Sequence, residues 1–308
     1  MIKTMMELFI EIALMITFGF FLQKRKIITQ ELQDGLSNLL LYAILPVSVL
    51  GSVNIERTQE MMKSLIQCAI FSTLFYLISF TVAFCVSRKM EMQSGEKNIF
   101  ILMNMFANVG FLGMPLTEAL CGKQGFLLAV IYNLVYQIFL VFLGIPLLKI
   151  FRKEQKNVID WRMLLDPLLI VSLIALIIFL SPYQLPEIIQ KTCDDIGSMM
   201  VPVSMFIIGS DLAEQKWKDI FSDKNAYLVC IFRLLIYPIM LLYILKWFKI
   251  STNVMIPVVL LTAMPCGSLN VILAKEYNCA AEFAARTVIL SMILMIITIP
   301  CIMILMGV

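Results

Sequence analysis

The chain has 308 residues, of which 61% are hydrophobic and only 15% are charged, and its formal net charge is +3. This composition excludes a soluble globular protein with one buried core, because the surface of such a protein would need more charged residues. Apolar runs of about 20 residues, the length needed to cross roughly 30 Å of hydrocarbon, recur between polar segments. The sequence therefore predicts a polytopic, all-α membrane protein.

Ten transmembrane helices are predicted in chain order, at residues 5–23, 35–53, 64–87, 98–120, 124–148, 163–181, 190–212, 225–247, 253–274 and 283–306. The first span carries Glu7 and Glu11 and lacks a small-residue cleavage site, so we expect a retained helix rather than a signal peptide. The eight cysteines form no CxxC pair and the chain has no histidine. We therefore expect neither a metal site nor a cofactor.

The positive charges indicate an orientation in the membrane. The connections that follow odd-numbered spans hold 16 of the 24 Lys and Arg residues, whereas the opposite side holds 7. The positive-inside rule places the richer side in the cytoplasm, so both termini of a multi-pass cell-membrane protein are expected to be extracytoplasmic. No basic patch remains to indicate a nucleic-acid partner.

Similar proline-containing segments recur after about 155 residues, which indicates an internal repeat. LPVSVLGS, with Pro46, resembles VPVSMFIIGS, with Pro202, and LGIP, with Pro146, resembles ITIP, with Pro300. We interpret residues 1–150 as a first five-helix repeat, 151–162 as a cytoplasmic linker and 163–308 as a second repeat. An odd number of spans per repeat gives inverted topology, as in many transporters. Coincidence among apolar segments is the alternative.

The fourth and ninth spans both carry residues that disfavour a continuous helix. These residues are Asn108, Gly110, Gly113 and Pro115 in the fourth span and Pro265, Gly267, Ser268 and Asn270 in the ninth. Interrupted helices at corresponding positions of inverted halves indicate a binding site at the membrane midplane. We expect free N–H groups at about Gly113 to Pro115 and Ser268 to Asn270 to face one cavity and to favour an anion. Alternatively, the prolines only kink the helices.

Three strings carry a family resemblance: NVGFLGMP in the fourth span, RLLIYP at Arg233 to Pro238, and AKEYN at Ala274 to Asn278. They resemble the auxin efflux carrier family, which includes plant PIN carriers and bacterial permeases for organic acids. The resemblance spans nearly the whole chain. It implies ten helices in two inverted repeats, crossing fourth and ninth helices, and a bile-acid-symporter-like elevator architecture. The transported species is typically a carboxylate.

The resemblance also implies individual site residues. Asn108 and Asn133 match asparagines that contact the substrate in PIN carriers, and Gln137 stands where those carriers have a tyrosine. Asn270 replaces their crossing proline, and their long cytoplasmic loop is missing here, so these differences argue against auxin as the natural substrate. The expected substrate-binding residues are Asn108, Gly113, Pro115, Asn133, Gln137, Ser268 and Asn270. The expected crossing residues are Gly110, Pro115, Pro265, Gly267 and Asn270.

Two charged residues within the spans need an explanation, because a charge in hydrocarbon costs at least about 2.5 kcal/mol. Arg233 either binds exposed carbonyl groups structurally or helps to hold an anion. Glu118 either faces water or exchanges a proton during transport.

The sequence thus predicts a secondary permease for a small organic anion, such as malate, malonate or an auxin-like acid, that works by alternating access. The coupling ion, H⁺ or Na⁺, and a homodimer are left open. A sodium-coupled symporter of the bile-acid type is one alternative. An intramembrane enzyme is another, although the chain has no histidine and no intramembrane Asp pair to catalyse a reaction.

Overall fold

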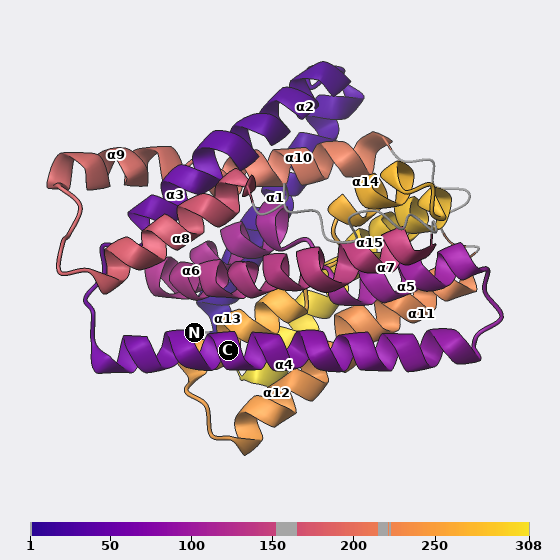
Figure 1. Cartoon of the computed structure of the whole chain (residues 1–308). Helices are drawn as coiled ribbons and strands as arrows, with labels where there is room; N and C mark the ends of the chain where they lie inside the picture. The colour runs from indigo at the N-terminus through magenta and orange to yellow at the C-terminus, as the bar shows by residue number, and fades with distance from the viewer. Residues whose placement is uncertain (1, 152–164, 215–220, 222, 308) are drawn as a thin grey trace.

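A computed structural model describes residues 2–151, 165–214, 221 and 223–307, and within these ranges it contains helices and no named strand. The α-helices are α1 (Ile2–Lys24), α2 (Gln30–Leu39), α3 (Leu45–Gly51), α4 (Gln59–Lys89), α5 (Ser94–Met105), α6 (Met114–Phe139), α7 (Ile145–Phe151), α8 (Pro167–Leu180), α9 (Glu187–Gly197), α10 (Met200–Glu214), α11 (Lys224–Ile231), α12 (Tyr237–Trp247), α13 (Thr252–Thr262), α14 (Leu269–Glu276) and α15 (Ala281–Met306). Figure 1 shows their arrangement. The predicted all-α class is confirmed. The 151–162 linker lies almost entirely outside the described residues.

Six continuous helical segments of the described chain are long and apolar enough to span a membrane: Gln30–Gly51, Gln59–Lys89, Val109–Lys149, Glu187–Ala213, Lys224–Trp247 and Ala281–Met306. The second and seventh predicted spans start earlier in the structure, at Gln30 and Glu187. The first turn of α2 is polar, and Thr29 caps it by accepting a hydrogen bond from the Leu32 N–H group. Hydropathy alone therefore does not locate the first residue of α2, because its polar first turn falls outside the apolar span.

At four places in the described residues, a helical segment widens into a single π turn just before a proline. The π turns are η1 (Leu40–Ile44), η2 (Val109–Gly113), η3 (Leu140–Gly144) and η6 (Phe232–Ile236), and the prolines are Pro46, Pro115, Pro146 and Pro238. A proline has no N–H group and crowds the carbonyl four residues before it. The wider turn relieves that contact, so these prolines lie within helical segments and do not end them. Gly122, with a φ of +64°, interrupts α6 instead, between the predicted fourth and fifth spans.

The helices pack as two groups. The first group contains α1, α2, α3, α8, α9 and α10, and the second contains α4 to α7 and α11 to α15. In the first, α1 and α10 approach so closely that a Cβ atom on Gly209 would lie 2.0 Å from the Ile16 carbonyl oxygen. The groups meet where η2 and α6 contact α8, α10 and η1. Each group therefore combines an early and a late part of the chain.

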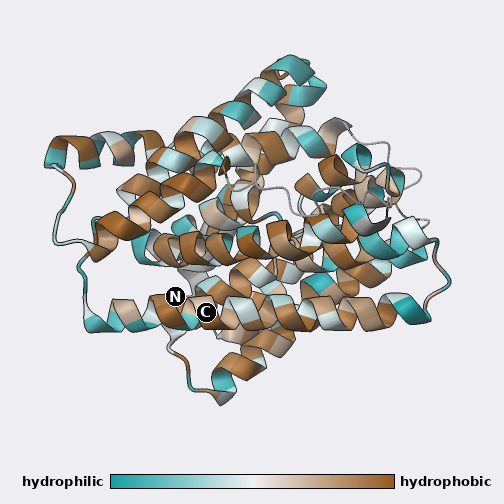
Figure 2. Ribbon diagram, viewed as in Figure 1, coloured by the Kyte–Doolittle hydropathy of each residue, from teal (hydrophilic) through white to brown (hydrophobic). Residues whose placement is uncertain are grey.

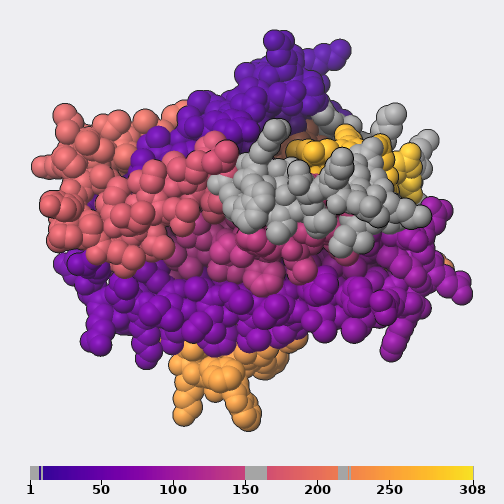
Figure 3. Space-filling view, viewed as in Figure 1, coloured from indigo at the N-terminus to yellow at the C-terminus, as the bar shows by residue number. Residues whose placement is uncertain are grey.

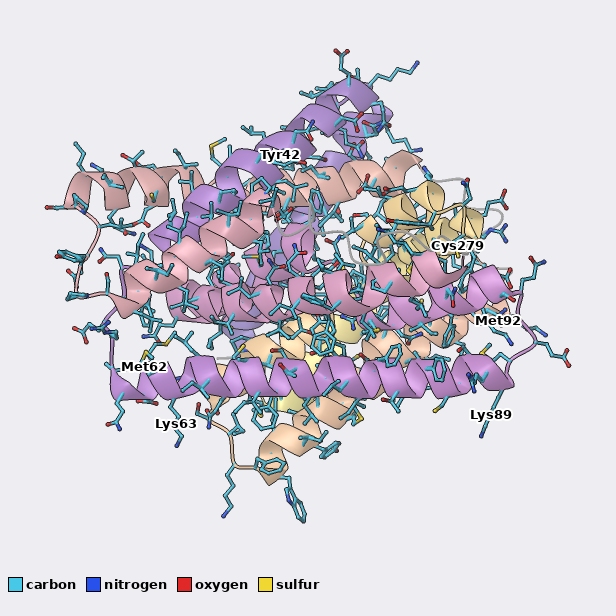
Figure 4. The ribbon with its side chains drawn as sticks, viewed as in Figure 1. Tyr42, Met62, Lys63, Lys89, Met92 and Cys279 are labelled. Carbon is cyan, nitrogen blue, oxygen red and sulfur yellow. The ribbon has the colours of Figure 1, made fainter. Side chains whose placement is uncertain are left out.

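The outer surface is apolar along the middles of the long helices. Figure 2 shows hydrophilic residues gathered at the helix ends, and Figure 4 places Lys63 and Lys89 near opposite ends of α4. In the space-filling view, α4 lies along one face and α12 projects beneath it (Figure 3). On α1, Leu14 is 64% exposed, as a side chain that faces lipid would be.

Candidate functional site

Two interrupted helical segments cross near the centre of the molecule. One interruption separates α5 from η2 at residues 106–108, and the other separates α13 from α14 at residues 263–268. The interruptions pair in antiparallel fashion: the Asn108 N–H group donates to the Pro265 carbonyl oxygen (2.8 Å), and the Gly267 N–H group donates to the Phe106 carbonyl oxygen (3.1 Å). Each break thereby satisfies backbone groups of the other, as a water-poor interior requires.

Gly267 is the residue that permits this approach. A Cβ atom at this position would lie 2.8 Å from the Ala107 carbonyl oxygen, which is backbone and cannot swing away. Asn270 strengthens the crossing from the same side, because its side-chain Nδ2 donates to the Phe106 carbonyl oxygen at 2.7 Å. The crossing thus depends on a glycine that leaves space and an amide that adds a bond.

The first interruption lies earlier in the chain than the sequence indicated. The helix resumes at Val109, whereas we expected its new N-terminus at Gly113 to Pro115. Gly113 instead packs η2 on α13, since a Cβ atom there would lie 2.9 Å from the Leu261 side chain. Pro115 follows the π turn inside the resumed helix, which accommodates it without a break.

Arg233 is fully buried behind the crossing. Its Nε donates to the Met264 carbonyl oxygen (3.1 Å) and its Nη1 to the Asn104 carbonyl oxygen (3.2 Å). Asn104 lies in the last turn of α5 and Met264 follows α13, so both carbonyls belong to the electronegative ends of interrupted helices. The guanidinium also lies over the Phe75 ring, 5.3 Å from its centroid. These contacts tie the two interrupted segments together.

A cavity of about 830 Å³ lies beside the crossing. Four of the predicted substrate-binding residues line it: Asn108, Asn133, Gln137 and Ser268. The crossing glycines Gly110 and Gly267 also line it, whereas Gly113, Pro115, Pro265 and Asn270 do not. The structure therefore brings together four polar residues, Asn108, Asn133, Gln137 and Ser268, and leaves Asn270 and the two prolines outside.

Two helix N-termini at this cavity lack side-chain caps. Asn108 is the N-cap residue of η2 and Ser268 that of α14, and neither side chain accepts a hydrogen bond from the helix that it begins. Asn133, only 3% exposed, adds an Nδ2 group that has no hydrogen-bond partner among the described residues. The Asn270 and Val271 N–H groups of α14 donate to the Gly267 and Ser268 carbonyl oxygens. The buried amide and the positive ends of the two helix dipoles remain as groups that attract a ligand with negative charge.

Other parts of the lining come from helices outside the crossing, and of these residues the sequence indicated only Asp211, as an acid near the end of a span that could exchange a proton. Residues of α2, α10 and α15 also line the cavity, among them Gln33, Asp211 and Met292. Asp166, the N-cap residue of α8, lines it as well. Gln33 donates through Nε2 to the Asp211 carboxylate and accepts from the Ser210 hydroxyl at 2.6 Å. These residues are isolated polar or apolar positions in helices far apart in the chain, so no motif marks them.

The cavity reaches the helix ends at Gln30, Asp34, Asp166 and Lys275. We call this end the mouth. Glu118 is half-buried and does not line the cavity.

Within the described residues, no group of three His, Cys, Asp or Glu side chains could hold a metal ion. Cys279, in the connection between α14 and α15, donates to the Gly95 carbonyl oxygen at 3.3 Å, and burial raises the pKa of its thiol to about 11. This cysteine is therefore a neutral packing group, with no thiolate character.

Comparison with known proteins assigns the chain to a class. Residues 4–303 match the family described as "Membrane transport protein". A protein of Methanothermobacter thermautotrophicus, described as an uncharacterized transporter, is 24% identical over 301 residues that cover 96% of each chain. Another uncharacterized transporter, from Methanocaldococcus jannaschii, is 20% identical over 290 residues, 93% of this chain and 94% of the relative.

The chain therefore belongs to the membrane transport protein family, and the resemblance to auxin efflux carriers is confirmed. It is a multi-pass membrane transporter, which is a non-enzymatic kind of function.

Proposed function

We propose that the protein is a secondary permease for a small organic anion, a carboxylate such as malate or malonate or an auxin-like acid, and that it works by alternating access. One observation carries the proposal: two half-helix N-termini without side-chain caps border one cavity, together with the Asn133 Nδ2 group, which has no partner in the described part of the chain. Helix N-termini attract anions through their free N–H groups and their dipoles. The substrate site comprises Asn108, Asn133, Gln137 and Ser268.

Donors without a formal charge suit transport. An amide or a backbone N–H group holds a carboxylate through hydrogen bonds worth about 1.5–3 kcal/mol each, enough for selection and weak enough for release. A fixed cation in the cavity would bind the anion more tightly and slow its departure. Arg233 is not such a cation, because it does not line the cavity and its guanidinium donates to two carbonyl oxygens behind the crossing.

The architecture that we propose with this function has ten helices in two inverted five-helix repeats, 1–150 and 163–308. The protein lies in the cell membrane, and both of its termini are extracytoplasmic. Three features support it. The interruptions occur at 106–108 and 263–268, close to the offset of about 155 residues between the repeats. Gly122 divides the longest helical segment where the fourth and fifth spans should meet. Each packed group draws helices from both repeats, so one group can slide against the other as an elevator.

A sodium-coupled symporter of the bile-acid type is the competing function. Carbonyl oxygens at broken helices suit Na⁺, but at this crossing several already accept protein donors. Arg233 binds those of Asn104 and Met264, and the Phe106 carbonyl accepts from Gly267 and Asn270. A guanidinium at this place supplies the positive charge that a bound sodium ion would bring, so we favour transport without Na⁺.

The experiment is a thermal-shift screen of the purified protein against carboxylates of two to six carbons, followed by uptake of radiolabelled hits, malate and malonate first, into proteoliposomes. A ligand that binds only the folded state raises the melting midpoint. Asn133→Ala should remove the shift, whereas Asn253→Ala, an exposed position at the start of α13, should keep it. If no carboxylate shifts the midpoint or enters the liposomes, the anion assignment is wrong, and uptake that requires Na⁺ would favour the symporter.

A further inference from the structure

Lys123 and Asp194 form an ion pair that joins the two groups of helices. The Lys123 Nζ lies 2.7 Å from each oxygen of the Asp194 carboxylate. Lys123 follows the kink at Gly122 in α6, which belongs to the second group, and Asp194 lies in α9, which belongs to the first. The pair therefore bridges the boundary across which any relative movement of the groups would occur.

This bridge lies at the end of the molecule opposite the mouth. The segment Gln30–Gly51 begins at the mouth and ends at Gly51, and α9 lies beside that end because Gln190 Nε2 donates to the Gly51 carbonyl oxygen at 2.8 Å. The same Nε2 donates to Asp194 Oδ1 at 2.9 Å and so holds the carboxylate in place. Neither member of the pair lines the cavity. The cavity reaches the helix ends at the mouth, and the ion pair joins the groups at the opposite end.

Alternating access, on which this inference rests, requires the closed end to open after the mouth has closed. Opening must separate the first group from the second at the point where Lys123 meets Asp194. We propose that this ion pair is a latch that holds the far end closed while the mouth is open. Its partners are half-exposed, at 42% and 40%, so water can solvate each charge after separation. Such a bond is weak enough to break once in every transport cycle.

The latch is tested without a substrate, by following access to the cavity. The Ser268→Cys variant, altered in the cavity lining, is labelled with a membrane-impermeant maleimide in intact cells and in inverted vesicles, which expose opposite faces. The unaltered protein gives the background of its eight native cysteines. We expect rapid labelling from the mouth and slow labelling from the far end. Lys123→Gln or Asp194→Asn should then raise the slow rate about three- to five-fold, since a surface ion pair shifts a two-state equilibrium by about that much.

Two further variants decide the interpretation. The exchanged pair, Lys123→Asp with Asp194→Lys, should return the far-end rate to that of the parent. Asp195→Asn, a neighbouring exposed acid on α9, should leave it unchanged. Equal rates in parent and latch variants would overturn the proposal, and so would a faster rate that the exchanged pair does not reverse. Loss of carboxylate binding with an intact latch effect would instead overturn only the anion assignment.

Discussion

The two crossing segments are built alike, but their polar residues make different contacts. Both interrupt a helix, and each gives the other a backbone hydrogen bond. Their asparagines differ: Asn108 borders the cavity without capping its helix, whereas Asn270 donates to the Phe106 carbonyl oxygen and is excluded from the lining. Two residues of the same type thus differ in place: one borders the cavity, and the other holds the two segments together.

The glycines differ in the same way. A Cβ atom on Gly267 would meet the Ala107 backbone at 2.8 Å, whereas one on Gly110 would have no neighbour within 4 Å. The second segment is therefore tightly packed at Gly267, whereas the first has open space at Gly110, which borders the cavity. If this contrast holds, substitutions in the second segment and behind it should destabilise the fold, and substitutions in the first should weaken binding.

The largest effect is expected from Arg233→Met, which leaves both segments without their shared donor. Two buried carbonyls lose a hydrogen bond to a charged group, so the free energy of unfolding should fall by about 3 kcal/mol, with a matching loss of yield. Arg286→Met, which breaks part-exposed ion pairs, should cost less than about 1 kcal/mol. Melting midpoints and expression levels measure both. Normal stability with abolished carboxylate binding would move Arg233 into the substrate site.

Next in size is Gly267→Ala compared with Gly110→Ala. The first forces a methyl group against backbone atoms and should destabilise the protein by about 1–3 kcal/mol. The second adds a methyl group in open space within a helical turn and should change stability by less than about 1 kcal/mol. The measurement is the difference between the melting midpoints of the two variants. Equal midpoints would show that the segments pack equally tightly.

Alanine substitutions of Asn270 and Asn108 test directly whether one segment stabilises the fold and the other binds the anion. Asn270→Ala removes one of two donors to the Phe106 carbonyl and should cost about 1 kcal/mol of stability with little change in affinity. Asn108→Ala should do the reverse: the protein should remain a folded peak on size exclusion, and anion affinity should fall about ten-fold, which is about 1.4 kcal/mol. Paired melting and binding curves give both quantities. An affinity loss confined to Asn270→Ala would reverse our assignment of the two residues.

This division also marks the limit of what the sequence could predict. Helical periodicity, span length and the polar residues in mid-span indicated the class of protein and the two segments that matter. They could not locate the first interruption, because Gly110, Gly113 and Pro115 all disfavour a regular helix and a π turn accommodates them. They could not assign Asn108 and Asn270 to different roles, since the direction of a side chain depends on the partner segment. The part of the lining from α2, α8, α10 and α15 follows from packing alone.

The smallest effect is expected at Ser268, the counterpart of Asn108 as the N-cap residue of its half-helix. A serine that caps a helix usually contributes about 1 kcal/mol, but the Ser268 hydroxyl accepts no N–H group of α14. Ser268→Ala should therefore leave the melting midpoint unchanged within about 0.5 kcal/mol and weaken anion binding only about two- to three-fold, because the backbone N–H groups remain. The ratio of this loss to that of Asn108→Ala measures how unequally the two helix ends share the ligand. A substantial fall in the midpoint would show that the hydroxyl caps α14, and that the second segment contributes cohesion even where it borders the cavity.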